Sequence, residues 1–231
     1  MSKIVPVLCI SKTALSVQQL APHADGHSVA STEFNIGNSD DFSFISRNIC
    51  DHKNDLDTVA NSFLQLLPYC IIYRCNNGSI EVLTYDRGNG AEARLHTNSS
   101  IGFGGHIYYE DMQGQSFDLN EIILNGLCRE LSEEVGIISP YTYAHVEPIG
   151  TILDYTNAVG KRHLCLGYTL KVSIDVDITD CHEITNPRWE SLDHLQERCN
   201  FEPTDTFNVP SGLESWSEKI IPLFKNHLNI A

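Results

Sequence analysis

The chain is poor in positive charge and lacks any long apolar run. Its 231 residues include 15 Lys and Arg against 30 Asp and Glu, which gives a formal net charge of −15. This balance argues against nucleic-acid backbones and anionic membrane surfaces as partners, whereas a small phosphorylated ligand needs only a few local cations or a metal ion. No segment approaches the roughly 18 apolar residues that predict a membrane-spanning helix. We therefore expect a small phosphorylated substrate, no nucleic-acid partner and no membrane partner.

Cysteine pairs with the spacing of a zinc site are also lacking. None of the eight cysteines forms a C-x-x-C pair, and Cys128 and Cys165 fall within apolar segments. This distribution favours buried, reduced thiols. The apolar start IVPVLCI is short, follows one lysine and has no cleavage-like site, so it predicts a strand rather than a signal peptide. A cytoplasmic location is expected.

The first part of the chain shows little periodicity, and the rest shows much more. The segment HADGHSVASTEFNIGNSDDFSF, residues 23–44, is rich in Ser, Asn, Asp and Gly and predicts loops. We therefore divide the chain into an N-terminal extension, residues 1–52, and a domain over residues 53–231.

Strands and helices are mixed in the predicted domain. YCIIYR and SIEVLTYD predict a hairpin closed by CNNG. Asp55 or Asp57 caps a predicted short helix that carries Phe63 and Leu66 and ends at Pro68. Further elements are expected as a helix over 119–135, strands near 143–153 and 163–173, and a strand end with a short helix in WESLDHLQER. Because β-α-β alternation is not strict, we predict an α+β domain with a mixed sheet.

The last predicted helix covers SGLESWSEKIIPLFKNHL. Ser211 and Glu214 are spaced as a capping box at its start, and Pro222 is expected to kink it.

The helix over 119–135 carries three glutamates along one edge. Glu130, Glu133 and Glu134 fall at i, i+3 and i+4, where like charges repel by roughly 0.2–0.5 kcal/mol per pair. Gly126 lies on the same arc. A glycine inside a helix costs about 1 kcal/mol of stability relative to alanine, so its presence suggests that another group approaches the backbone closely there. Gly136 is placed to end the helix. A solvated acidic face is one interpretation; a divalent cation that converts the repulsion into coordination is the other.

These residues resemble a known motif. GG at 104–105 followed by RELSEEVGI at 129–137 is similar to the Nudix box, whose second half runs R-E-U-x-E-E-x-G-U with U apolar. Every fixed position of that half agrees: Arg129, Glu130, Leu131, Glu133, Glu134, Gly136 and Ile137. The wider stretch, roughly residues 58–200, resembles a bacterial subgroup of predicted phosphoesterases of the MutT/Nudix type. The resemblance implies the Nudix fold, a mixed β-sheet sandwiched between helices, here with the N-terminal extension.

The same resemblance implies a metal-dependent hydrolase. The expected reaction is water attack on phosphorus in the pyrophosphate bond of a nucleoside diphosphate-linked or related small molecule. The implied ligands of Mg²⁺ or Mn²⁺ are Glu130, Glu133 and Glu134, with the carbonyl of Gly105 as a further ligand. Arg129 would orient these carboxylates by ion pairing. One of the metal ligands, Glu133 included, is also a candidate for the catalytic base.

The first half of the box departs from the family pattern. Seven residues separate Glu121 from Arg129, as in the family, but fifteen separate Gly105 from Glu121. Asp111 instead follows Gly105 with the usual five residues between them. Either acid is a candidate partner for Arg129, and we favour Glu121 because its offset from the helix is kept.

Other candidate residues come from the flanking segments. Glu183 stands six residues before Trp189 in EITNPRW, where some family members carry the catalytic base, and Glu147 and Asp154 compete for that role. Weak candidates for substrate binding are Arg94, Lys161 and Arg162. His163 is expected to be a satisfied structural histidine, and Tyr108 and Tyr109 are candidates for stacking on a base.

Two alternatives remain open. One is an isopentenyl-diphosphate-isomerase-like reaction on the same fold, for which Cys165 and His106 are present but the surrounding motifs are not matched. The other is a non-catalytic ligand-binding module, although every acid of the helix is kept. A homodimer is expected from family habit alone.

Overall fold

The computed structural model describes residues 5–15, 28–32, 39–51, 61–88, 98–114, 117–173, 184–199 and 212–230. Its strands are β1 (Pro6–Ser11), β2 (Ser28–Ser31), β3 (Phe42–Ser46), β4 (Phe63–Asn76), β5 (Ser79–Arg87), β6 (Ser99–Ser100), β7 (Gly102–Phe103), β8 (Val146–Asp154), β9 (His163–Lys171) and β10 (Ile184–Ser191). Its α-helices are α2 (Arg47–Cys50), α4 (Leu119–Val135), α5 (Ser139–His145), α6 (Leu192–Cys199) and α7 (Ser215–His227). Short 3-10 helices are η1 (Lys12–Ala14), η2 (Ser39–Asp41), η4 (Tyr109–Asp111) and η5 (Gly160–Arg162).

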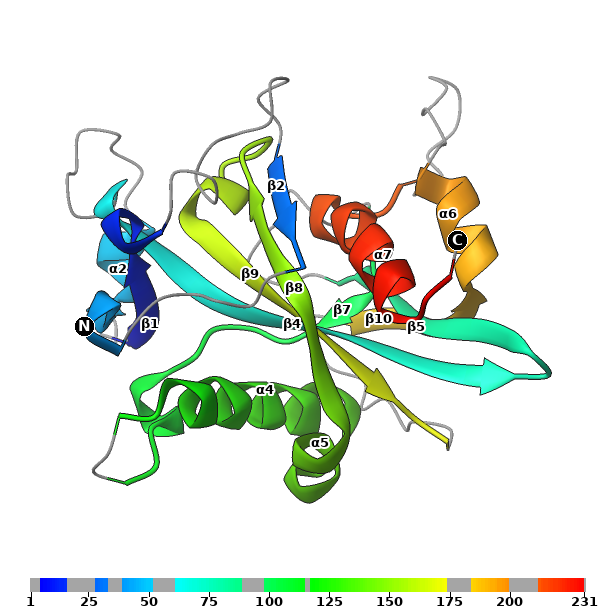
Figure 1. Cartoon of the computed structure of the whole chain (residues 1–231), viewed down its shortest axis with the longest axis horizontal. Helices are drawn as coiled ribbons and strands as arrows, with labels where there is room; N and C mark the ends of the chain where they lie inside the picture. The colour runs from blue at the N-terminus through cyan, green and yellow to red at the C-terminus, as the bar shows by residue number, and fades with distance from the viewer. Residues whose placement is uncertain are drawn as a thin grey trace.

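A mixed sheet forms the centre of the molecule. Its main path runs β10-β5-β4-β9-β8-β2, with β1 beside β3 and β4, β6 beside β5, and β7 beside β4 (Figure 1). The β4–β9 pair is parallel, and the other pairs are antiparallel. The predicted α+β class with a mixed sheet between helices is confirmed.

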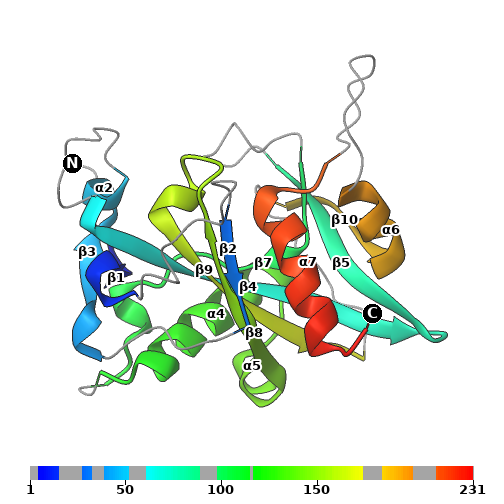
Figure 2. The same cartoon turned by 45° about the horizontal axis from the view of Figure 1, so that its top comes forward.

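Helices cover both faces of this sheet. In Figures 1 and 2, α4 and α5 lie on one side of β4 and β9, while α6 and α7 lie on the other. One apolar core joins β4 and β9 to α4 and contains Leu66, Phe103 and Leu131. A second joins the opposite face to α6 and α7 and contains Ile71, Leu195 and Phe224. None of the helices in the described parts of the chain is long and apolar enough to cross a membrane.

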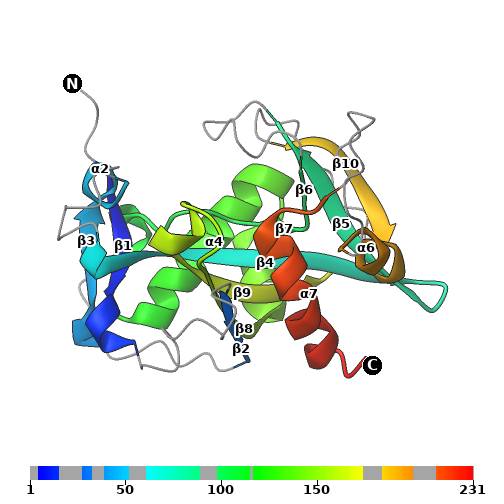
Figure 3. The same ribbon diagram turned by 90° about the horizontal axis from the view of Figure 1, so that it is seen from above.

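Strand β4 is the axis of the sheet and runs the length of the molecule in Figure 3. On one edge it pairs with β9, from Gln65–His163 to Tyr73–Lys171. Its other edge meets β1 near its start and β7 near Cys70, and farther on it meets β5. The hairpin to β5 closes as predicted, through Asn77 and Gly78 with φ of 50° and 82°.

The helix predicted to end at Pro68 is confirmed only at Asn61 and Ser62, which are helical, and is wrong from Phe63 onward. Phe63, Leu66 and Pro68 all lie in β4, whereas Asp55 and Asp57 fall outside the described residues. The strand is buried on both faces, so its apolar run has no period that separates strand from helix. Pro68 is tolerated because it lies between the parts of β4 that pair with β1 and with β7.

Strands also replace part of the loop predicted for residues 23–44. The initial strand is confirmed as β1, but β2 and β3 were not expected. They form strands because β8 and β1 supply partners, with Ser28 opposite Asp154 and Phe42 opposite Ile10. Thus strands from the proposed extension share the sheet with the rest; the boundary at residue 52 stays a prediction.

The helices agree better with the sequence. α4 begins after Asp118, whose side chain accepts hydrogen bonds from two backbone N–H groups, and ends at Gly136 with φ of 66°, both as the sequence predicts for 119–135. WESLDHLQER gives the end of β10 and then α6. α7 contains Pro222 as predicted but begins only at Ser215, and Ser211 lies outside the described residues. α5 was not predicted.

Candidate active site

The pair Gly104–Gly105 lies directly against the glutamates of α4. The backbone N–H of Gly104 donates to Glu134 Oε2 at 3.1 Å. A Cβ on Gly105 would lie 2.7 Å from Glu130 Oε1, and a Cβ on Gly104, where φ is +140°, would lie 2.2 Å from the carbonyl oxygen of Pro68. No side chain fits at Gly104, and one at Gly105 would displace the Glu130 carboxylate. The glycine pair therefore lets the turn touch two carboxylates of one helix.

Arg129 gathers the groups around this turn. Its guanidinium donates to both oxygens of Asp111, at 2.9 and 3.0 Å, and to Glu130 Oε1 at 2.8 Å. It also donates to the carbonyl of His106 at 2.8 Å and lies 4.7 Å from the ring centre of Tyr108. Burial lowers the pKa of Arg129, but hydrogen bonding to Asp111 and the charge of Glu130 outweigh it and raise that pKa. The guanidinium is thus a fixed cation between the turn and the helix.

Asp111, and not Glu121, is the acid that pairs with Arg129. Glu121 is exposed in the first turn of α4, eight residues and therefore about 12 Å of helix from Arg129, so the preference for Glu121 is wrong. The Asp111 side chain is 6% exposed and also accepts from the backbone N–H of Tyr108 at 2.8 Å. Gly126 permits this approach, since a Cβ there would lie 3.2 Å from Asp111 Oδ2. The close approach that a helix-interior glycine suggested is thus made by the η4 turn.

The three glutamates of the box differ in their surroundings. The Glu130 side chain is 14% exposed; burial raises its pKa, while the charge of Arg129 acts in the opposite direction. Glu134 is half-buried beneath Gly104. The Glu133 side chain is 61% exposed, with Oε2 at 3.4 Å from Arg129. Two carboxylates therefore face the turn, and the third stands at its open side.

The carboxylates suit a hard divalent cation in their chemistry. Mg²⁺ prefers oxygen ligands and retains several waters, so two carboxylates and a peptide carbonyl at a glycine turn are an appropriate set of donors. Within the described ranges, no three His, Cys, Asp or Glu side chains converge closely enough to enclose a metal ion. In this conformation Glu133 does not join Glu130 and Glu134 in such a group. The residues fit a site that is completed by the ligand's own oxygens.

Comparisons with known proteins show what the whole chain is similar to. No protein-family model matches the chain. It is 31% identical over 166 residues to Protein YmaB of Bacillus subtilis, an alignment that covers 71% of this chain and 72% of YmaB. Its structure is similar to Tm1382, a protein grouped with the Nudix hydrolases, with a TM-score of 0.61, 18% identity, and coverage of 96% of this chain and 99% of Tm1382. The chain is therefore a relative of YmaB and has the fold of the Nudix hydrolases.

A further Nudix structure is less similar. The Nudix domain of Shewanella oneidensis NrtR, solved with ADP ribose, gives a TM-score of 0.46 at 16% identity, covering 75% of this chain and 94% of that one.

The candidates for a catalytic base are not all at the Nudix helix. Glu183 lies outside the described residues. Glu147 forms an ion pair with His227 of α7 at 3.0 Å, so it lies on the sheet face opposite α4. Asp154 is fully buried and accepts hydrogen bonds from Ser215 of α7 and Thr156. Burial acts to raise the pKa of Asp154, but these bonds and Lys219 lower it overall.

The two weak candidates for substrate contacts that the structure describes, Lys161 and Arg162, lie on η5 and not on the Nudix helix. Arg94 lies outside the part of the chain that the structure describes. Lys161 is exposed on η5, and Arg162 donates to the carbonyl of Cys50 at 3.1 Å. Tyr108 packs under Arg129, whereas Tyr109 is 53% exposed beside Phe44.

Burial bears on the roles expected for two further residues, Cys165 and His163. Cys165 is fully buried, and burial raises the pKa of its thiol well above its ordinary value. It is unsuited to act as the reactive cysteine of an isomerase. His163 is only partly satisfied: its Nδ1 contacts the carbonyl of Val159 at 2.7 Å, but its buried Nε2 has no partner among the described residues.

Little in the sequence indicates the groups that support Arg129. His106 contributes a backbone carbonyl and Tyr108 a ring, and both follow from the path of the chain after Gly105. For Asp111 a signal existed, namely its spacing of five intervening residues from Gly105.

Proposed function

We propose that this Nudix protein hydrolyses a pyrophosphate bond in a nucleoside diphosphate-linked or related small molecule, with Mg²⁺ or Mn²⁺ as cofactor. The observation that carries the proposal is the contact between the glycine turn and the box glutamates, with Arg129 fixed between them by Asp111. Glu130, Glu133 and Glu134 would hold the cation, with the Gly105 carbonyl as a further ligand. The alternative of a non-catalytic ligand-binding module on the same fold is distinguished by the assay below.

The chain's own residues would position the reacting groups. Phosphoryl transfer to water depends mainly on positioning and on neutralising charge. Glu130, Glu133 and Glu134 would hold a divalent cation, which would supply the charge neutralisation. Arg129 holds the Glu130 carboxylate in place, so this ligand needs no reorganisation when the substrate arrives. Water would be activated by Glu183 or by a box glutamate such as Glu133. Glu147 and Asp154 are less suited, because both interact with α7 on the other face of the sheet.

A substrate panel with matched variants tests this function. Nucleotide sugars, dinucleoside polyphosphates, ADP-ribose, NADH and oxidised nucleoside triphosphates should be assayed with Mg²⁺, with Mn²⁺ and with a chelator. We expect metal-dependent cleavage of at least one class. Glu134→Gln and Glu133→Gln should lower kcat/KM by more than the ~10–100-fold typical of an outer-sphere partner. Glu197→Gln, an exposed acid on α6, is the control and should match the wild type.

Two results of that assay would refute the hydrolase. One is unchanged turnover in Glu134→Gln. The other is the absence of turnover with either metal although nucleotides bind, which would identify a ligand-binding module. Formation of an allylic product from isopentenyl diphosphate, followed by NMR, would instead favour the isomerase-like reaction.

Location and assembly are further parts of the proposal. All seven cysteines in the described ranges are free thiols, which supports a reducing, cytoplasmic compartment. Homodimer formation stays a prediction, which sedimentation or light scattering of the purified protein would test.

A further inference from the structure

Unpaired polar atoms gather beside the glycine turn. Within the described residues, four buried side-chain nitrogen or oxygen atoms have no hydrogen-bond partner, and three of them belong to Gln65, His106 and His163. Gln65 and His163 are register partners on the parallel strands β4 and β9, so their side chains leave the same face of the sheet. The ring of His106 lies 5.5 Å from that of His163. Buried polar atoms are seldom left unpaired in folded proteins, so this grouping requires an explanation.

The hydrogen-bonding role of two of these atoms is fixed by their neighbours. Gln65 uses its amide nitrogen as a donor to Asp51 Oδ1 at 2.9 Å, which leaves Oε1 as a free acceptor. His163 Nδ1 lies 2.7 Å from the carbonyl of Val159, and because a carbonyl only accepts, Nδ1 carries the proton. Burial lowers the pKa of His163, which keeps the ring neutral. His163 Nε2 is therefore a second free acceptor.

The location connects these acceptors to the Nudix site. His106 directly follows Gly105, and its carbonyl accepts a hydrogen bond from Arg129. On the other side, the Trp216 ring at the start of α7 lies 6.3 Å from the ring of His163 in an edge-on contact. The group therefore lies between the turn that faces the glutamates and the first turn of α7.

We propose that Gln65 Oε1 and His163 Nε2 accept hydrogen bonds from the uncharged part of the pyrophosphate substrate, with His106 as a third contact. The ligand group must carry donors, that is hydroxyl groups of a ribose or sugar or an amino group of a base. Phosphate oxygens are excluded because they too are acceptors and carry negative charge. This inference rests on the proposed function and assigns the end of the substrate that does not react.

Binding without turnover tests the assignment. Dissociation constants of ADP, GDP, CDP and UDP should be measured by calorimetry in the presence of a chelator, and then those of the tightest ligand's 2′,3′-dideoxy and N-dimethylated analogues. We expect one analogue to bind at least about tenfold more weakly to the wild type, and the affected analogue shows whether hydroxyl or amino groups are recognised. This comparison alters only the ligand, so it does not depend on whether a variant folds.

Matched variants locate the effect. In Gln65→Met and His163→Phe, the discrimination between the nucleotide and its analogue should fall to about twofold or less, because the acceptor is gone. Thr142→Val removes the fourth unpaired atom, which lies on α5, and should keep the wild-type discrimination.

Three outcomes would overturn the inference: equal binding of nucleotide and analogues, discrimination that persists in both variants, or no binding of any of the four nucleotides at millimolar concentration. A crystal structure of the complex that places only an ordered water against Gln65 Oε1 and His163 Nε2 would also overturn it. The binding assay contains a chelator and does not depend on hydrolysis. A protein that distinguishes the nucleotide from its analogue in this assay but hydrolyses no substrate with Mg²⁺ or Mn²⁺ would therefore refute the proposed function and leave this inference standing.

Discussion

At the scale of single residues, the geometry around Arg129 depends on one carboxylate. Asp111 occupies two of the guanidinium's donors and is itself fixed by the backbone of Tyr108. Without Asp111, Arg129 would keep Glu130 as its main ionic partner and would hold that carboxylate in a different geometry. The expected consequence is a less stable fold and a looser ligand set at the turn.

A pair of substitutions separates Asp111 from Glu121. Asp111→Asn should lower the free energy of unfolding by about 1–3 kcal/mol, because a buried charge-assisted pair is lost. Glu121→Gln should stay within about 0.5 kcal/mol of the wild type, since its side chain is exposed. Urea denaturation followed by circular dichroism measures both. Equal effects of the two substitutions would contradict the assignment of Asp111.

Sequence spacing could identify the residues of the box but not all of their partners. The fixed positions of residues 129–137 placed the glutamates on the correct helix. Spacing alone does not decide the partner of Arg129, because Glu121 keeps the usual offset along the helix and Asp111 keeps the usual offset from Gly105. Gln65 could not be found, since its importance depends on the strand that lies beside it, almost a hundred residues later in the chain.

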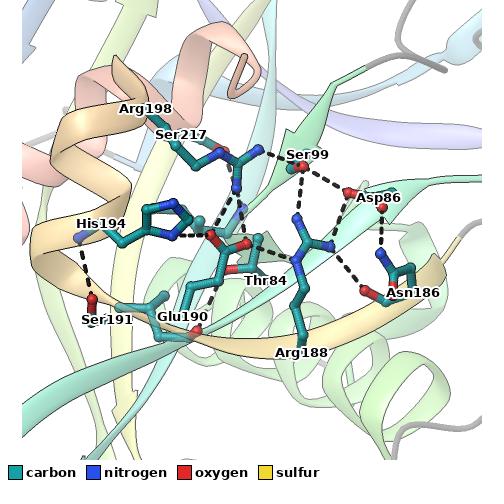
Figure 4. A network of polar contacts seen from close by, with 12 residues as sticks. Thr84, Asp86, Ser99, Asn186, Arg188, Glu190, Ser191, His194, Arg198 and Ser217 are labelled. Atoms are coloured by element: carbon teal, nitrogen blue, oxygen red, sulfur yellow. Dashed lines mark hydrogen bonds and ion pairs between the residues drawn. The ribbon is translucent and has the colours of Figure 1, made fainter. Parts of the chain in front are cut away.

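At the scale of elements, a network of charges joins β10 to α6 and to β5. Glu190, whose side chain is 8% exposed, accepts from Arg188 at 2.8 Å and from Arg198 at 2.9 Å (Figure 4). Arg188 also donates to Asp86 of β5, and both arginines donate to Ser99 of β6. Arg188 of β10 thus pairs with Asp86 of β5, and Arg198 of α6 pairs with Glu190 of β10. Glu190 is shared by both arginines.

Removal of the shared charge should loosen these elements. Glu190→Gln should lower the free energy of unfolding by about 3 kcal/mol, because two arginines lose a buried partner. Glu197→Gln on the exposed side of α6 should change it by less than about 0.5 kcal/mol. Thermal and urea unfolding of the three proteins would test this, and a Glu190→Gln protein as stable as its control would show that the network adds no stability.

The elements that the sequence predicted correctly carry their signals locally. α4 has an aspartate before its first turn and a glycine after its last one, so both ends were predictable. β4 was mistaken for a helix near its start because Phe63 and Leu66 are spaced as on a helix and Pro68 resembles a terminator. β2 has no such local signal; it is a strand because β8 lies beside it.

At the scale of the whole molecule, the strands described within the first fifty residues are joined to the rest of the sheet. Leu8 and Ile10 of β1 are fully buried in the core on the α4 side, and β1 pairs with the start of β4. β2 covers the outer edge of β8. An unprotected strand edge next to exposed apolar surface is prone to aggregation.

Deletion tests whether residue 52 is a true boundary. A chain that begins at residue 53 should be insoluble or should show no cooperative unfolding, because β4 loses β1 and the core loses Leu8 and Ile10. Solubility, circular dichroism and a thermal melt measure this. A soluble protein that melts cooperatively would instead establish residues 1–52 as a dispensable extension.

The pairing of Ser28 with Asp154 has a consequence for biosynthesis. The β2 segment leaves the ribosome more than a hundred residues before its partner strand has been made. Its backbone groups must remain hydrated, or be shielded by chaperones, throughout that interval. Translation speed between these two segments is therefore a variable that governs the yield of correctly assembled protein.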